Sequence, residues 1–197
     1  MRFKLFGTEI YISFLFASVI TLMLLFDKTG LILPLLFAVF MHELGHLFMM
    51  YIRAAAPKRI KLIPASVQIT KPFIRDYKND IIISLSGPCV NILLFAVFYF
   101  NYKCYLNTTT LYIALLNLII GVFNLLPIKG LDGGTVFYCV LCKYTNVNKA
   151  ELILGTISFL GGLALLLSAV VLTLRGKINI SLYIMGIYLL VTTIIKK

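Results

Sequence analysis

Two histidines and a glutamate stand within five residues, in the segment His42-Glu43-Leu44-Gly45-His46. On a helix, residues four apart share one face, so both imidazoles could bind one metal ion with Glu43 beside them. Zinc bound in this way lowers the pKa of a water toward about 7, and a nearby carboxylate can take the proton as that water attacks a carbonyl. The motif therefore predicts a zinc hydrolase with Glu43 as general base.

A catalytic zinc site generally has three protein ligands, so two histidines leave it one ligand short. The chain has no further histidine, which favours a carboxylate as the third ligand. The other acidic residues lie at the ends of apolar stretches or in a charged loop: Glu9, Asp27, Asp76, Asp80 and Glu151. Asp132 remains, in a segment broken by proline and glycine. The alternative is that Asp132 only N-caps a short helix over Gly133 to Lys143, and both roles could hold together.

The composition is that of an integral membrane protein, with 61% hydrophobic residues, 13% charged residues and a mean hydropathy of +1.01. Apolar stretches near the length of about 20 residues that a spanning helix needs cover residues 10–26, 31–51, 81–100, 111–126, 152–174 and 178–195. We expect an all-α polytopic fold with about six transmembrane helices, forming one domain over residues 1–197 without a soluble accessory domain. Since ionisable groups inside a membrane are costly, His42, Glu43 and His46 need a functional reason; a structural or proton-relay role is the alternative.

The net charge of +11 follows the predicted topology. With the N-terminus inside, all but four of the 18 Lys and Arg residues fall on the inner side; the exceptions are Lys28, Lys103, Arg175 and Lys177. This bias places both termini in the cytosol. It also explains the basicity without nucleic acid as a partner.

A short β-hairpin is expected after the second helix, over residues 58–71, because β-branched residues flank Pro64-Ala65-Ser66 there. The segment could be a basic loop that holds anionic lipid headgroups, or a strand edge onto which an extended substrate adds. The four cysteines are scattered and are interpreted as packing thiols: Cys89, Cys104, Cys139 and Cys142.

Two further motifs accompany the histidines. Asn124, Pro127, Asp132 and Gly133 form N-x-x-P-x-x-x-x-D-G, and Gly87, Pro88 and Asn91 form G-P-x-x-N. Together with H-E-x-x-H, this pattern resembles the site-2 protease family of intramembrane zinc metalloproteases. Six spans with short loops are similar to the bacterial stage IV sporulation protein FB branch.

The resemblance implies one zinc ion per chain on His42, His46 and Asp132, with catalysis by Glu43. It also implies that Asn124 and Asn91 position the substrate or stabilise the oxyanion. The substrate would be a membrane-associated protein cut within or beside its membrane segment, which in sporulation relatives is a sigma-factor precursor. The expected setting is a bacterial plasma membrane with the active site open to the cytosol and a regulatory membrane protein as candidate partner.

The chain departs from the family in two places. Pro64-Ala65-Ser66 stands where relatives often have glycines, and the nucleotide-sensing CBS domain of sporulation relatives is absent from the sequence. The sequence disfavours three rival functions. Intact Glu43 argues against a catalytically idle relative, the sparse polar groups of the outer half argue against a metal transporter, and the Asn124 to Gly133 match argues against an unrelated peptidase of prenylated proteins.

Overall fold

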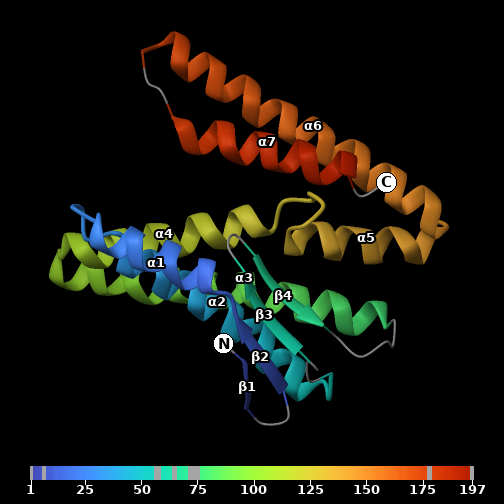
Figure 1. Cartoon of the computed structure of the whole chain (residues 1–197), viewed down its shortest axis with the longest axis horizontal. Helices are drawn as coiled ribbons and strands as arrows, with labels where there is room; N and C mark the ends of the chain where they lie inside the picture. The colour runs from blue at the N-terminus through green and yellow to red at the C-terminus, as the bar shows by residue number, and fades with distance from the viewer. Residues whose placement is uncertain are drawn as a thin grey trace. The chain divides into compact units, whose positions relative to one another are not determined.

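The computed structural model describes residues 2–5, 8–55, 59–63, 66–70, 76–176 and 179–195. The chain divides into two compact units, residues 1–123 and 124–197. Helices dominate both units, and all strands among the described residues belong to the first unit (Figure 1).

The first unit contains four helices: α1 (Phe14–Leu25), α2 (Ile32–Ile52), α3 (Tyr77–Tyr105) and α4 (Thr108–Asn124). The carboxylate of Asp76 caps α3 by accepting a hydrogen bond from the backbone N–H of Lys78 at 3.0 Å. This cap satisfies one of the N–H groups that a helix start leaves without a partner. Since α2 packs against α3, side chains of these two helices can meet.

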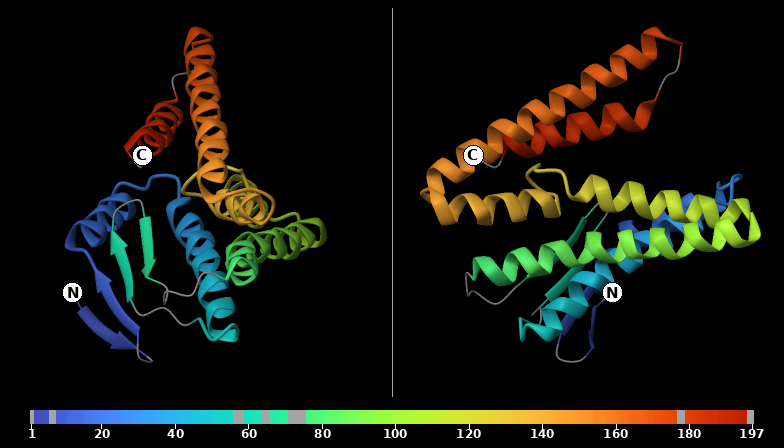
Figure 2. Two further views of the ribbon diagram at one scale, coloured as in Figure 1. Left: turned by 90° about the vertical axis from the view of Figure 1, so that its right-hand side faces the viewer. Right: turned by 180° about the vertical axis from the view of Figure 1, so that it is seen from behind.

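Four strands form one sheet in the order β1-β2-β3-β4, where β1 is Arg2–Leu5, β2 Thr8–Ile12, β3 Arg59–Ile63 and β4 Ser66–Thr70. β1 and β2 pair antiparallel, as do β3 and β4, whereas β2 and β3 pair parallel. A parallel pair needs a long crossover connection, and here α1 and α2 provide it (Figure 2). The β3–β4 pairing falls on the segment for which a hairpin is expected, and its association with a membrane stays a prediction.

The stretch 10–26, expected as a first span, is a strand followed by a short helix. β2 takes residues 8–12, and α1 has 12 residues, a length of about 18 Å against the ~30 Å of a bilayer core. The physical reason lies in Thr8-Glu9-Ile10-Tyr11-Ile12, in which every residue but Glu9 is β-branched or aromatic, the types that favour strands. Hydropathy alone does not detect that preference.

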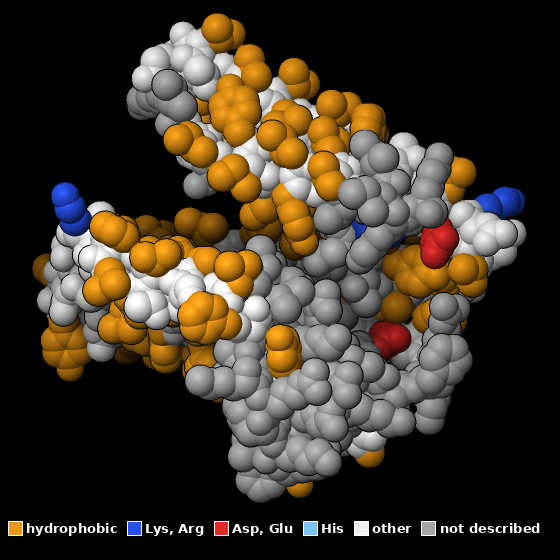
Figure 3. Space-filling model, in the orientation of Figure 1, with side chains coloured by type: hydrophobic (Ala, Val, Ile, Leu, Met, Phe, Trp, Pro, Cys, Tyr) orange, Lys and Arg blue, Asp and Glu red, His pale blue; other side chains and the backbone are white. Residues whose placement is uncertain are grey.

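Three described helices are long and apolar enough to cross a membrane: α2, α3 and α6. α4 and the Leu182–Val191 part of α7 are shorter apolar helices. Many large apolar side chains are exposed along these helices (Figure 3), among them Phe100, Leu152 and Leu167. Lipid would cover such side chains, so the structure agrees with a membrane protein, while the number of six spans stays a prediction.

The second unit contains α5 (Asp132–Tyr144), α6 (Val147–Leu174) and α7 (Ile180–Ile195). α6 and α7 form a helical hairpin, visible in both views of Figure 2. Gly162 lets the helices approach, because a Cβ there would lie 2.9 Å from Leu190 Cδ2. The hydroxyls of Thr173 and Tyr183 add a hydrogen bond of 3.0 Å between the two helices.

Candidate metal centre

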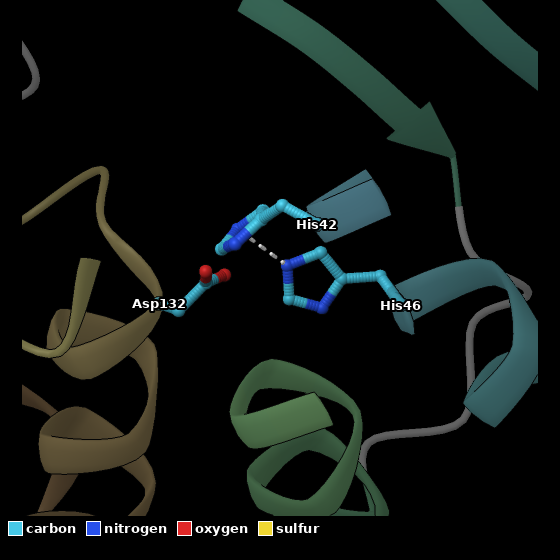
Figure 4. Close-up of side chains that lie close together, drawn as sticks. All are labelled: His42, His46 and Asp132. Carbon is cyan, nitrogen blue, oxygen red and sulfur yellow. Dashed lines mark hydrogen bonds between the residues drawn. The ribbon is translucent and has the colours of Figure 1, made fainter. Parts of the chain in front are cut away.

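The face of α2 that packs against α3 carries both histidines. His42 and His46 are 5% and 6% exposed, and their ring centroids lie 4.7 Å apart with nearly perpendicular planes. Figure 4 shows the two rings with the hydrogen-bond line between them. The shared helical face inferred from the i to i+4 spacing is therefore present in the structure.

Both imidazoles are held through Nδ1. His46 Nδ1 lies 2.7 Å from the backbone carbonyl oxygen of Ile83, and His42 Nδ1 lies 2.6 Å from Asn91 Oδ1. Oxygen atoms of these two kinds only accept hydrogen bonds, so each Nδ1 carries the proton. In a neutral imidazole, each Nε2 then carries a lone pair and is the nitrogen that can bind a metal.

The two Nε2 atoms face each other at 3.1 Å. Two lone pairs at this separation repel unless a proton or a cation lies between them. Two nitrogens bound to one tetrahedral zinc ion at about 2.0 to 2.1 Å would stand about 3.3 Å apart. The arrangement of His42 and His46 therefore fits zinc ligation.

Glycines allow α3 to lie directly against the histidine face. A Cβ at Gly87 would lie 2.6 Å from His46 Cε1 and 2.9 Å from His42 Cε1. From the other side, a Cβ at Gly45 would lie 2.9 Å from the carbonyl oxygen of Ser86. Real Cβ atoms do not approach so closely, so any larger residue at Gly87 would displace the rings of His42 and His46.

The turn of α3 beside Gly87 contains Pro88, which is fully buried. Proline has no N–H, so Pro88 leaves the carbonyl of Ser84 without its usual intrahelical donor. The neighbouring carbonyl of Ile83 accepts hydrogen bonds from His46 Nδ1 and, at 2.6 Å, from the Ser86 hydroxyl. The G-P pair thus belongs to the part of α3 that supports His46.

Asn91 holds His42 from α3 and is completely buried. Its Nδ2 donates to the carbonyl of Ala38 at 3.1 Å and to Asn117 Oδ1 at 2.9 Å, while its Oδ1 accepts from His42. Both amide hydrogens are therefore engaged inside the protein. Asn91 therefore orients His42 in this structure, and neither hydrogen of its amide is left for a substrate or an oxyanion.

Glu43 follows His42 on α2 and is half-buried, and Asn124 is the last residue of α4 and is also half-buried. Glu43 lies about 100° round the helix from His42, which is the placement that the motif predicts.

Asp132 is the first residue of α5, in the second unit. The capping position belongs to Leu131, so the alternative that Asp132 N-caps the helix is wrong. Negative side chains are favoured in the first turn of a helix because they face the positive end of its dipole. A carboxylate at this place suits a metal ligand, which must be deprotonated.

Glycines also shape the segment that leads to Asp132. The backbone N–H of Leu131 donates to the carbonyl of Ile128 at 3.0 Å, and Gly130 has a φ of +99°. This is the conformation of a type II turn, which needs glycine at its third position. A Cβ at Gly133 would overlap the carbonyl of Leu125, so this motif glycine lets residues 125–128 fold back over the start of α5.

The same segment is fixed to α6. The backbone N–H of Lys129 donates to the hydroxyl of Ser158 at 2.7 Å, and that hydroxyl donates to the carbonyl of Leu154 at 2.7 Å. Ser158 is completely buried. Pro127, which precedes this anchor and is half-buried, ends the apolar run of α4 as the sequence indicates.

His42 and His46 belong to the first unit and Asp132 to the second, and each of the three side chains labelled in Figure 4 offers an atom that can bind a metal ion. The sequence motifs did not single out three residues that hold these side chains or the segments that carry them, namely Asn117, Ile83 and Ser158. Asn117 and Ser158 are polar residues inside the apolar stretches 111–126 and 152–174, a signal that could have found them. Ile83 acts through its backbone and leaves no such signal.

Comparisons with known proteins find similarity to metalloproteases. Residues 102–169 match the model of Peptidase family M50. A zinc metalloprotease of Methanocaldococcus jannaschii is 28% identical over 170 residues, which cover 79% of this chain and 49% of that protein. The chain thus spans about half the length of this curated relative.

A solved structure, the site-2 protease from Methanocaldococcus jannaschii, has the same fold. Its TM-score is 0.71 at 26% sequence identity, with 98% of this chain and 93% of that chain covered. The shared fold covers both units of the chain and therefore includes the helices that carry His42, His46 and Asp132. Family model, curated relative and solved structure thus all point to a similarity with peptidase family M50 and the site-2 proteases.

Proposed function

We propose that the chain is an intramembrane zinc metalloprotease that cleaves a membrane-associated protein within or next to its membrane segment. The observation that carries the proposal is the pair of Nε2 atoms, 3.1 Å apart, on a buried face of an apolar helix. Both Nδ1 atoms donate to oxygen acceptors, so in both rings Nε2 is the nitrogen that can bind a metal, and the two Nε2 atoms face each other. His42, His46 and Asp132 are the proposed zinc ligands.

Zinc, when bound, supplies a Lewis acid that polarises a carbonyl and makes water a nucleophile near neutral pH. Glu43 takes the proton from the attacking water and delivers it to the departing amide nitrogen. The side-chain amide of Asn124 donates a hydrogen bond to the carbonyl oxygen as negative charge develops on it. Asn91 has no part in this step, because both of its amide hydrogens bind protein acceptors.

The depth of the site follows from its place on α2. His42 is the eleventh residue of that helix, and at 1.5 Å per residue it lies about 15 Å from the start. A bilayer core is about 30 Å thick, so we place the metal near its middle. With the orientation that the basic residues predict, the N- and C-termini lie in the cytosol, from which water reaches the site.

A substrate must be extended where it is cut, because a helical peptide has its carbonyls in hydrogen bonds and shielded. An end strand of the sheet could hold an extended segment by adding it as a further strand. β4 is such an end strand, in the order β1-β2-β3-β4. We propose the β3–β4 hairpin as the element that receives the substrate.

The narrower assignment rests on the sequence motifs alone. Short loops and the three motifs favour the stage IV sporulation protein FB branch, a bacterial plasma membrane and a sigma-factor precursor as substrate. A regulatory membrane protein would be the second partner. These finer statements stay predictions, and a substrate search with an inactive variant is the way to test them.

The experiment that tests the proposal compares wild type, Glu43→Gln and Asp132→Ala, purified in detergent. Elemental analysis should find about one zinc ion per chain in wild type and Glu43→Gln, and much less in Asp132→Ala, because a catalytic site needs three protein ligands. Glu43→Gln should keep zinc but lose cleavage of a membrane-peptide library. A wild-type protein that takes up no zinc under metal-replete conditions would refute the proposal.

A further inference from the structure

Asn117 lies in the middle of α4 and is completely buried. Its Nδ2 donates to the carbonyl of Ile113, one turn earlier, at 2.9 Å. Its Oδ1 accepts from Nδ2 of Asn91 at 2.9 Å. A buried amide in an apolar helix is unfavourable unless its hydrogen-bonding groups are satisfied, and here the partner on α3 is the residue that holds His42.

The direction of these hydrogen bonds is fixed by two backbone carbonyls, which can only accept. The carbonyl of Ile113 requires Nδ2 of Asn117 on its side, so Oδ1 of Asn117 points to Asn91. Asn91 must therefore donate to Asn117 through its Nδ2, and the carbonyl of Ala38 also accepts from this Nδ2. Its Oδ1 is thereby turned to His42, where it accepts the proton on Nδ1.

We propose that Asn117 is a positioning residue for the metal centre, acting through Asn91 to hold His42 in the tautomer with the proton on Nδ1. The metal-binding nitrogen of His42 is thus selected by a chain of hydrogen bonds from α4 through α3 to α2. The functional meaning of this chain rests on the proposed zinc site. The hydrogen-bond chain itself involves residues of α2, α3 and α4 between Ala38 and Asn117, all within the first unit.

Gly121 brings α4 close enough for the contact. A Cβ there would lie 3.2 Å from Cβ of Asn91 and 3.4 Å from the carbonyl oxygen of Pro88. Gly121 follows Asn117 by four residues, so both lie on the face of α4 that meets α3. A small residue at such a place lets two membrane helices approach, as interhelical hydrogen bonds between side chains require.

His46 provides an internal reference, because Nδ1 of that ring binds the backbone carbonyl of Ile83 and no part of the asparagine chain. A change at Asn117 should therefore affect His42 and leave His46 as it is. The chain has two histidines in all, so spectra of histidine-labelled protein contain two imidazoles. The tautomer of each can be followed without metal and without substrate.

The experiment uses the full chain, labelled with ¹⁵N-histidine, metal-free in detergent micelles at about pH 8.5, where imidazoles are neutral. Long-range ¹H–¹⁵N spectra of wild type should show both rings with the proton on Nδ1. In Asn117→Val, His42 should shift to a mixture of tautomers while His46 does not change. Asn117→Asp keeps the acceptor oxygen and, as a neutral acid in its buried site, can still donate to Ile113, so it should restore the wild-type signal of His42.

Zinc affinity, measured against a competing chelator, gives the second readout. Loss of the direct hydrogen-bond partner of a metal-binding histidine weakens affinity about 10- to 100-fold. Asn117 acts on His42 through Asn91, so Asn117→Val should weaken zinc binding by up to about tenfold, and Asn117→Asp should bind like wild type. Thr173→Val is the matched control, because it removes a hydrogen bond between α6 and α7. It should leave both histidine signals and the zinc affinity unchanged.

The inference is overturned if His42 keeps its Nδ1 tautomer and its zinc affinity in Asn117→Val, or if His46 changes as much as His42. Should Asn117→Val not fold, Asn117→Ala removes the same acceptor without added volume, and the same criteria apply to it. Failure of the proposed function looks different. In that case wild type would bind no zinc, while the tautomer of His42 would still respond to Asn117.

Discussion

Asn91 Oδ1 lies 2.6 Å from Nδ1 of His42, and this hydrogen bond decides which nitrogen of the ring is left for a metal. The G-P-x-x-N motif of α3 therefore acts on the H-E-x-x-H motif of α2 through direct contacts. Gly87 makes room for both rings, Pro88 lies in the turn that supports His46, and Asn91 orients His42. Sequence motifs far apart in the chain describe one cluster of side chains.

Asn91→Ala should weaken zinc binding by about 10- to 100-fold, the usual effect of losing the partner of a metal-binding histidine. His42 Nδ1 would lose its acceptor, and Asn117 Oδ1 would lose its donor. Competition with a chelator measures the affinity. Unchanged affinity would mean that Ala38, Asn91 and Asn117 form a structural network without effect on the metal.

Gly87→Ala should abolish stoichiometric zinc binding, because the new methyl group would occupy the space of the His46 ring and lie 2.9 Å from His42 Cε1. Gly155→Ala is the control, since a Cβ at that position of α6 meets nothing within 4 Å. The control should keep its zinc and unfold at the same or a slightly higher temperature, because alanine is favoured over glycine in helices by about 1 kcal/mol. Zinc content and thermal unfolding in detergent check both variants. A zinc-replete Gly87→Ala protein would contradict this packing.

The sequence was sufficient to predict the parts of the site that depend on helical spacing. His42, Glu43 and His46 lie as their spacing requires, and five of the apolar stretches fall on α2, α3, α4, α6 and α7. Spacing says nothing about partners that come from other helices. Asn117 was missed for this reason, although a buried amide in an apolar helix is itself a signal.

Other differences between the predicted and the observed elements occur where tertiary contacts override the local sequence pattern. Hydropathy extended the first apolar stretch over β2, because Ile10, Tyr11 and Ile12 are as apolar as a helix would need. Its pairing with β3 depends on residues about fifty positions away, which no local pattern contains. Asp132 lies beside the break after α4, as the proline and glycine residues of this segment indicate. Its exact position, as the first residue of α5 after the cap at Leu131, depends on the turn at Gly130, which the sequence pattern does not predict.

Ser158→Ala should destabilise the second unit by about 1 to 3 kcal/mol, the usual penalty when a buried donor loses its acceptor. The N–H of Lys129 would lose Ser158 Oγ, the acceptor to which it donates at 2.7 Å. Thr156→Val is a suitable control, because that exposed hydroxyl on the same helix only binds the carbonyl of Leu152. Chemical denaturation in detergent compares them. Equal stability of both variants would show that the segment before Asp132 does not depend on this anchor.

Asp27 organises the chain between α1 and α2. Its Oδ2 accepts from the backbone N–H of Ile32 at 3.0 Å, and its Oδ1 accepts from the hydroxyl and N–H of Thr29 and from Gly30 N–H. The hydrogen bond from Ile32, followed by that from the Thr29 hydroxyl, lowers the pKa of Asp27 from 3.8 to about 2. A lowered pKa stabilises the folded protein at pH values above 3.8, and the contribution is lost as the pH falls toward 2.

Asp27→Asn should therefore lower the unfolding temperature at pH 6 and should flatten its dependence on pH between about 4 and 2, where the wild-type aspartate becomes protonated. The amide keeps one acceptor oxygen but cannot bind Ile32 and Thr29 with two oxygens at once. The measurement is made on metal-free protein, so that loss of zinc in acid does not contribute. Asp76→Asn is the control, because Asp76 caps α3 through a single hydrogen bond to Lys78. If wild type and Asp27→Asn lost stability in parallel from pH 4 to pH 2, the carboxylate of Asp27 would not be the group that titrates in this range.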